Sequence, residues 1–164
     1  MTTLLLTSLL IGIGATLGID LWALLLRRGF GIASLNYCLL GRWFLHMPAG
    51  RFVHASIGAA EPKAGECAIG WVAHYSIGIS LALGFLLLAP ADWLTRPTLL
   101  PALAFGVVTT LMPFLVVQPA LGLGIASSKS PKPGQARVKS LMTHTVFGLG
   151  LYLTALLLAP LRAR

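Results

Sequence analysis

The chain has 164 residues, of which 57% are hydrophobic and only 10% charged, and its formal net charge is +8. A soluble domain carries roughly a quarter charged residues, so this composition excludes an ordinary soluble protein and predicts an all-α integral membrane protein. The basic residues flank long apolar stretches, which is a topology signal of membrane proteins and excludes nucleic acid as the expected partner.

Four apolar stretches are long enough to cross a bilayer, which predicts one membrane domain, residues 1–164, built as a four-transmembrane-helix bundle. The expected spans are residues 4–26, 67–89, 98–124 and 138–159. Pro113 and Pro119 lie inside the third span, and each removes a backbone hydrogen-bond donor. The third span should therefore bend or break between Thr109 and Pro119.

The first connection, residues 27–66, is too long for a simple turn. Its aromatic and leucine content predicts two short amphipathic helices in the membrane interface, broken at Met47–Pro48. The alternative is plain anchoring by tryptophan and arginine side chains. Cys38 and Cys67 show no metal-binding spacing, and the orientation given below puts them in the reducing cytoplasm, so both are expected to be unpaired.

The second and fourth spans share a pattern. Residues 71–90 and 141–160 align without gaps and are identical at nine of 20 positions, including His74/His144 and Gly78/Gly148. Because the two spans run in the same direction, the match predicts a partial parallel internal repeat that relates helices two and four.

Lysine and arginine counts set the expected orientation. Residues 27–66 and the connection before the fourth span carry nine basic residues, counting Lys139 at its start, whereas the opposite side carries three. The positive-inside rule then places both long connections in the cytoplasm and both termini outside.

This topology brings four strongly polar residues to one depth, roughly 10 Å below the cytoplasmic surface. They are Asp20, His74, Gln118 and His144, one from each span, and Tyr75 lies beside His74 in sequence. Ionisable groups inside a membrane are costly and usually functional, so these five residues are the candidates for binding a solute or an ion.

Three motifs carry a family resemblance: GATLGIDLW at residues 14–22, GRWFLHMPAGRFVH at 41–54 and GECAIGWVAHYSIG at 65–78. The sequence resembles a family of small multi-pass bacterial inner-membrane proteins whose function is unknown. The resemblance implies a location in the inner membrane and draws attention to the non-apolar motif positions. Besides Asp20 and His74, these are the candidates for a cytoplasmic mouth of the bundle, namely Arg42, His46, Arg51, His54 and Glu66.

Four functions remain open on this evidence. The first is binding or transport of a small solute, ion or proton through the polar layer, with a homodimer or larger complex completing the small bundle. The second is a haem b protein with His74 and His144 as axial ligands. The third is a metal enzyme using His46, His54, His74 and Asp20 or Glu66. The fourth is an accessory subunit without chemistry, and the sequence favours a protein that is not an enzyme.

Overall fold

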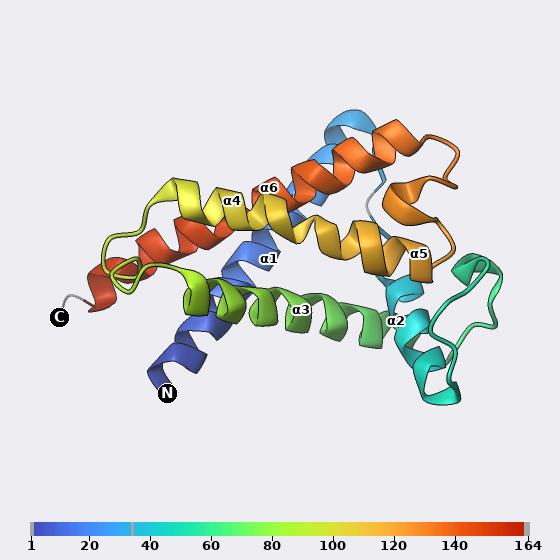
Figure 1. Ribbon diagram of the computed structural model, residues 1–164, viewed down its shortest axis with the longest axis horizontal. Helices are drawn as coiled ribbons and strands as arrows, with labels where there is room; N and C mark the ends of the chain where they lie inside the picture. Colours follow the sequence, from blue (N-terminus) through green and yellow to red (C-terminus); the bar gives the residue numbers. More distant parts are fainter. Residues whose placement is uncertain (1, 34, 163–164) are drawn as a thin grey trace. The chain divides into compact units, whose positions relative to one another are not determined.

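The computed structural model describes residues 2–33 and 35–162, and every described element is a helix, turn or extended segment without a strand (Figure 1). Four helical stretches are long and apolar enough to cross a membrane: Thr3–Phe30, Glu66–Leu88, Leu99–Ala120 and Pro133–Pro160. The predicted all-α class with four such spans is therefore confirmed.

The first helix, α1, covers Thr2–Phe30 and is longer than the predicted span. Its last turn contains Arg27 and Arg28, whose positive charges suit the negative end of a helix dipole. Gly31 then adopts a positive φ of 66°, and the amides of Gly31 and Ile32 donate to Arg27 and Leu26 carbonyls. This glycine ends the helix because other residues rarely adopt that conformation.

The first connection contains α2, Tyr37–His46, followed by 3-10 turns η1, Met47–Ala49, and η2, Ile57–Ala59. The first predicted short helix is present and ends at Met47–Pro48 as expected. The second is only the single turn η2, because residues 51–56 run extended and use their backbone groups in contacts elsewhere. The second span is α3, Glu66–Leu88, which stops before Pro90.

The third span loses regular α-helical bonding where its prolines lie, as predicted. Helix α4 covers Leu99–Thr109, a π-helical turn η3 covers Pro113–Val117, and α5 is the short segment Gln118–Ala120. The span ends earlier than residue 124, since Gly122 and Gly124 have φ values of 90° and 74°. A 3-10 turn η4, Ile125–Ser127, follows, and α6 covers Pro133–Arg162, five residues ahead of the predicted start at 138.

The contacts of the chain gather into two compact units. The bundle unit comprises residues 2–33, 75–109 and 142–162, and the loop unit comprises residues 35–74 and 110–141. The prediction of one domain over residues 1–164 stays a prediction, as does the internal repeat.

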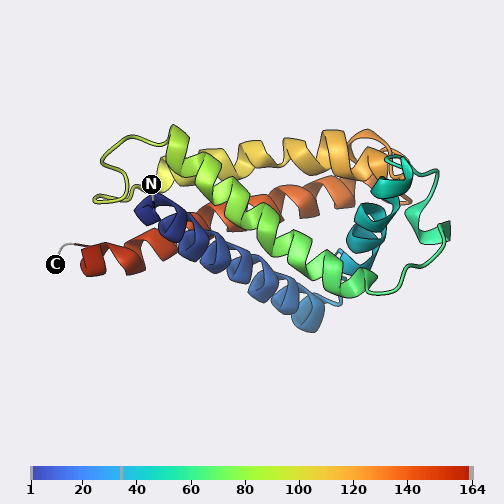
Figure 2. The same cartoon turned by 90° about the horizontal axis from the view of Figure 1, so that it is seen from below.

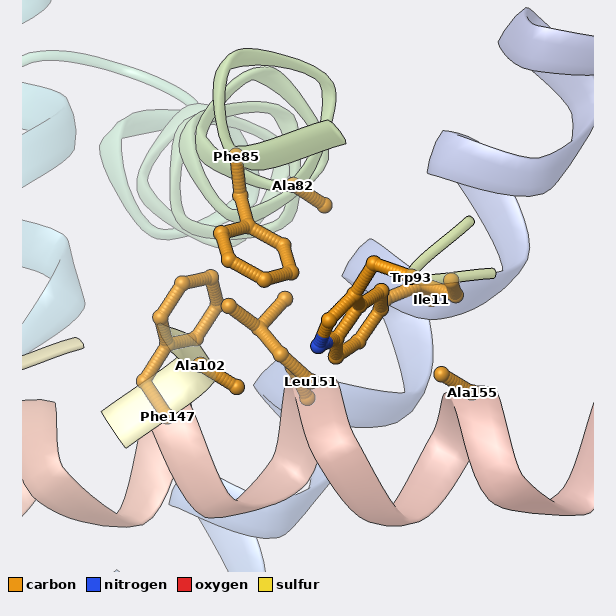
Figure 3. Close-up of a cluster of buried hydrophobic side chains, with 9 residues drawn as sticks. Ile11, Ala82, Phe85, Trp93, Ala102, Phe147, Leu151 and Ala155 are labelled. Carbon is orange, nitrogen blue, oxygen red and sulfur yellow. The ribbon is translucent and has the colours of Figure 1, made fainter. Parts of the chain in front are cut away.

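The core of the bundle unit draws side chains from α1, α3, α4 and α6 (Figure 3). Trp93, in the turn after α3, is 2% exposed, and its ring meets Phe85 edge-on with centroids 4.6 Å apart. The Trp93 Nε1–H donates to the Thr98 carbonyl at 3.0 Å, which satisfies its buried polar atom. Small residues let the helices approach closely: a Cβ on Gly148 would lie 2.6 Å from the Ala102 carbonyl oxygen.

The core of the loop unit is smaller and joins α2 to the end of the third span. Its buried members are Leu40, Trp43, Ile57, Ala120 and Leu121. Figure 2 shows α2 as a short helix beside the start of α3. At this crossing, Gly41 of α2 faces Glu66 and Gly70 of α3. A Cβ at Gly41 or Gly70 would collide with backbone atoms of the other helix, so only glycine permits this crossing.

Candidate functional site

In the bundle unit, Asp20 of α1 meets Tyr75 of α3. The Tyr75 hydroxyl donates to the Asp20 Oδ2 at 2.8 Å. Gly12 and Thr16, on the same face of α1 as Asp20, contact α3 at Gly78 and Ile79, so this face of α1 meets a neighbouring helix. A carboxylate that accepts a hydrogen bond from a phenol O–H is stabilised in an apolar setting, because this bond replaces part of its lost hydration.

The second polar contact of the bundle unit joins α4 and α6. The Thr109 hydroxyl lies 2.6 Å from the Gly106 carbonyl oxygen and 2.8 Å from the His144 Nδ1. The carbonyl can only accept, so the single hydroxyl proton goes to Gly106 and the His144 Nδ1–H donates to Thr109. In the neutral ring this leaves Nε2 of His144 with a lone pair that can accept a proton.

In the loop unit, Gln118 follows directly on the π-helical turn and is 8% exposed. Its Nε2–H donates to the Ser140 Oγ at 3.1 Å, whereas its Oε1 is buried without a hydrogen-bond partner among the described residues. The Thr110 Oγ1 is buried and unpartnered in the same way. Buried polar atoms of this kind are uncommon and often mark a place that water or an ion occupies.

His74 lies in an aromatic setting in the loop unit. Its ring stacks on Tyr37, with centroids 4.1 Å apart and an interplanar angle of 24°, and meets Trp71 edge-on at 5.9 Å. The predicted polar residues are thus engaged inside their own units, Asp20 and His144 in one and His74 and Gln118 in the other. Their convergence into one layer, and a haem between His74 and His144, both stay predictions.

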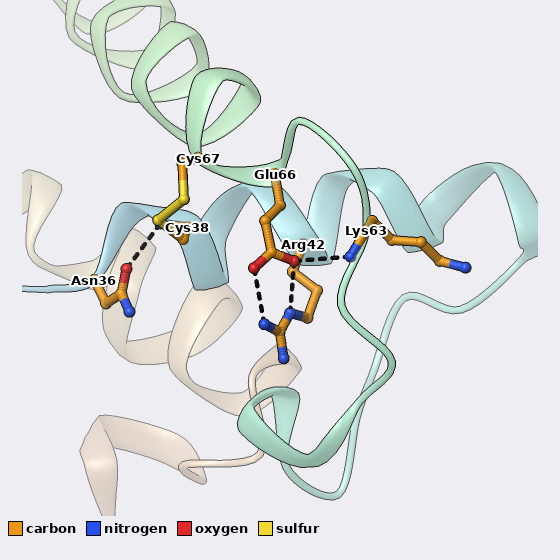
Figure 4. Close-up of a disulfide and its surroundings, with 6 residues drawn as sticks. All are labelled: Asn36, Cys38, Arg42, Lys63, Glu66 and Cys67. Carbon is orange, nitrogen blue, oxygen red and sulfur yellow. Dashed lines mark hydrogen bonds and ion pairs between the residues drawn. A yellow bond between two sulfur atoms is a disulfide. The ribbon is translucent and has the colours of Figure 1, made fainter.

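Arg42 and Glu66, predicted at the mouth, form a fork-to-fork ion pair (Figure 4). The Arg42 Nε and Nη2 donate to the two carboxylate oxygens of Glu66, both at 2.8 Å. The Arg42 Nη1 donates to the carbonyls of Ile57, Gly58 and Ala60, and Glu66 also accepts the Lys63 amide at 2.9 Å. The hydrogen bond with Glu66 raises the pKa of Arg42 above its ordinary value, against the opposing effect of burial. Arg42 and Glu66 therefore hold the connection in place, and their hydrogen-bonding groups are already used by other parts of the protein.

The cysteine prediction is wrong, because Cys38 and Cys67 form a disulfide beside this ion pair (Figure 4). Each cysteine stands three residues before one of the crossing glycines, Gly41 and Gly70, so the close approach of α2 and α3 brings the sulfurs together. The repeated Cys-x-x-Gly spacing was the signal in the sequence. A disulfide is typical of an oxidising compartment, whereas the count of basic residues placed this part of the chain in the cytoplasm.

The remaining mouth candidates lie on the docked connection. The His46 side chain is 2% exposed, its Nε2 lies 3.0 Å from the Glu61 carbonyl oxygen, and its ring meets the His54 ring with centroids 5.2 Å apart. The backbone amides of His54 and Ile57 donate to the carbonyls of Ala120 and Leu121. The connection is therefore packed against the end of the third span, while Arg51 is exposed.

Sequence reasoning missed the partners that complete these contacts: Tyr37, Thr109 and Ser140. Each lies on a different segment from the residue it serves, and no periodic pattern links the two. The candidate metal set also gains no support, since the described residues contain no group of three or more His, Cys, Asp or Glu side chains placed to hold a metal ion.

A family model described as a protein of unknown function, DUF2938, matches residues 9–158. The chain belongs to the DUF2938 family. The match covers the second and third apolar spans, most of the first and fourth, and both long connections, and it confirms the resemblance to a family without a known activity. Neither the curated proteins nor the solved structures contain a significant match.

Proposed function

We propose that this DUF2938 protein is a multi-pass protein of the bacterial inner membrane that binds and passes a small cation, the proton included, through the polar residues of its spans. The proposal rests on one observation above all, the interruption of the third span at η3 with the buried, unpartnered Oε1 of Gln118 next to it. Interrupted membrane helices present backbone carbonyls and side-chain oxygens to bound ions.

The chemistry of the atoms around this interruption favours a cation. Pro119 has no N–H, so the Leu115 carbonyl lacks its ordinary α-helical donor. The Gln118 Oε1 and the Thr110 Oγ1 are two buried oxygens in the same unit. Carbonyl and amide oxygens with unused lone pairs coordinate hard cations or accept hydrogen bonds, and a hydroxyl oxygen can do the same.

Two groups in the bundle unit suit proton transfer. Asp20 is ionisable and held by Tyr75, and His144 keeps an acceptor nitrogen after bonding to Thr109. A neutral imidazole nitrogen can accept a proton, and carboxylates in membrane spans commonly act as proton carriers. These side chains support a pathway that carries protons, alone or coupled to another ion.

Purified protein reconstituted into vesicles tests the proposal through proton and sodium fluxes driven by an imposed membrane potential. We expect Gln118→Leu and Asp20→Asn each to reduce the flux of the wild-type protein at least about tenfold, the effect of losing about 1.4 kcal/mol of binding. Gln135→Leu and Asp92→Asn are the matched controls, because both residues are exposed and lie outside these contacts. Absence of any flux in the wild type, or equal fluxes in Gln118→Leu and Gln135→Leu, would overturn the proposal.

A further inference from the structure

We infer that the loop unit contains a binding site for a small phosphate-type oxyanion, in a hollow beside His54 and Lys129. This site goes beyond the proposed cation pathway, because it lies in the docked connection and binds the opposite charge. The hollow has a volume of about 530 Å³ and is lined on one side by residues 53–55 and on the other by segments that follow the third span.

Backbone docking builds the walls of the hollow. The His54 amide donates to the Ala120 carbonyl at 2.9 Å, which fixes the extended segment against the end of the third span. Gly122, with a φ of 90°, contacts the Ala55 carbonyl so closely that a Cβ would collide with it. Any other residue at position 122 would push the two walls apart, so the glycine sets the width of the site.

The side chains that line the hollow can donate hydrogen bonds but carry no negative charge. His54, Ser128 and Lys129 are its polar members, and no carboxylate is among the lining residues. The only two acids of the loop unit, Glu61 and Glu66, are committed to Lys63 and Arg42. Lys129 makes no ion pair with any described residue. An ammonium group without a carboxylate nearby attracts an anion.

His54 supplies the second, independent observation. Both of its ring nitrogens are buried, and neither has a hydrogen-bond partner among the described residues. The neighbouring His46 cannot serve, since its Nε2 is engaged with the Glu61 carbonyl and the two rings meet edge-on. An imidazole always carries at least one N–H, so a turn of this ring toward the hollow would give that hydrogen an acceptor on a bound oxyanion.

A lysine, a serine hydroxyl and a histidine N–H together suit the oxygens of a phosphate group. Lysine binds phosphate as a point charge, and hydroxyl and imidazole donors add direction. The same oxygens occur on free inorganic phosphate and on the headgroup of an anionic phospholipid such as phosphatidic acid. The hollow is open enough for either, so the two sources are separated by experiment.

The test measures binding of two probes to the full-length protein in detergent: inorganic phosphate by titration calorimetry and short-chain phosphatidic acid by native mass spectrometry. We expect saturable binding of at least one probe, with the Kd raised about tenfold or more by Lys129→Gln, as loss of a charge-assisted contact implies. Lys132→Gln is the matched control, an exposed lysine of the same segment that does not line the hollow.

His54→Ala is a second variant for the same binding measurements, and its melting temperature checks that it folds. Binding of phosphate identifies a free solute and binding of phosphatidic acid alone identifies a lipid, and both results support the site. The inference is overturned if neither probe binds, or if Lys129→Gln and Lys132→Gln weaken binding equally, which would indicate unspecific attraction to a basic surface. Ion fluxes are not part of this test, so its failure leaves the cation pathway standing.

Discussion

The two units of this protein are held together in different ways. In the bundle unit, helices approach through small residues, with glycines or alanines at the contacts of α1 with α3, α1 with α6 and α4 with α6. In the loop unit, one arginine fork, one disulfide and two backbone hydrogen bonds to the third span fix an irregular connection. One unit depends on shape and the other on directional bonds.

The two units differ because apolar helices are suited to lipid surroundings, whereas an irregular connection must satisfy its own backbone polar groups. Lipid tails are as apolar as leucine, so burial of apolar surface gives little attraction between membrane helices, and close packing must supply it. An irregular connection has backbone groups that no helix satisfies, so it needs side chains that bond to carbonyls and amides. Arg42, which reaches three carbonyls and a carboxylate, meets that need.

The sharpest way to break the loop unit is Arg42→Gln. The change removes both bonds to Glu66 and leaves that carboxylate without its charged partner, in addition to three carbonyls without a donor. Removing one partner of a shielded ion pair is more damaging than removing both, so we expect the largest fall in melting temperature of all these variants. Tryptophan fluorescence on heating measures it, and the exposed Arg51→Gln should melt with the wild type.

The next largest effect should come from the disulfide. Cys38 and Cys67 are 29 residues apart, and closing a loop of that length stabilises a chain by about 3–4 kcal/mol in the chain-entropy description. The Cys38→Ser, Cys67→Ser double variant should therefore unfold at lower temperature than the wild type, and reduction of the wild type should have the same effect.

The same cysteines also decide between the two indications of orientation. Alkylation of membranes at harvest, without reductant, should find no free thiol if the disulfide persists in an oxidising compartment. Free thiols at both positions would instead support a cytoplasmic location for this part of the chain, as the count of basic residues predicts.

For the bundle unit, Gly148→Ala tests the role of close packing. The new methyl group would lie 2.6 Å from the Ala102 carbonyl oxygen and 3.0 Å from the Leu103 Cα, so α4 and α6 must separate. We expect a loss of about 1–3 kcal/mol, the usual cost of overpacking. Gly84→Ala is the control, since nothing lies near its Cβ position and alanine favours helix. Equal melting temperatures for the two variants would contradict packing by small residues.

A smaller effect is expected for the hydrogen bond between Tyr75 and Asp20. A double-mutant cycle with Tyr75→Phe and Asp20→Asn should give a coupling of about 0.6 kcal/mol, the average for hydrogen bonds between membrane helices. Tyr152→Phe is the comparison, because the Tyr152 hydroxyl makes no hydrogen bond with the described residues, and this change should be additive with Asp20→Asn. A coupling free energy of zero between Tyr75 and Asp20 would show that their hydrogen bond orients the two side chains without stabilising the fold.

The smallest effect concerns Glu61 and pH. Its hydrogen bond with Lys63 lowers the pKa of Glu61, so the ionised form is favoured in the folded chain. This contribution is present above the ordinary glutamate pKa and is lost as pH falls through the lowered value. Glu61→Gln should therefore remove a slight part of the acid sensitivity of the melting temperature below about pH 4, since the pair is exposed and screened. An unchanged pH profile would mean that the pair contributes nothing.

Much of the fold could be predicted from the sequence, because the relevant information is local. The positions of the four spans follow from unbroken apolar length, and the interruption of the third span follows from Pro113, which cannot donate a backbone hydrogen bond. The break of α2 at Met47–Pro48 has the same origin. The spacing of Gly12, Thr16 and Asp20, four residues apart, likewise puts small and polar residues on one helix face, and that face meets α3.

The pairings within the candidate sites were decided only by the tertiary structure. Asp20 finds Tyr75, Arg42 finds Glu66, and His54 docks on Ala120, across separations that no helical or strand period spans. The cysteines show the reason. Whether Cys38 and Cys67 form a disulfide depends on whether Gly41 and Gly70 let α2 and α3 come into backbone contact. Composition and periodicity report what each segment buries, whereas partners depend on which segments meet, and that is set by packing of the whole chain.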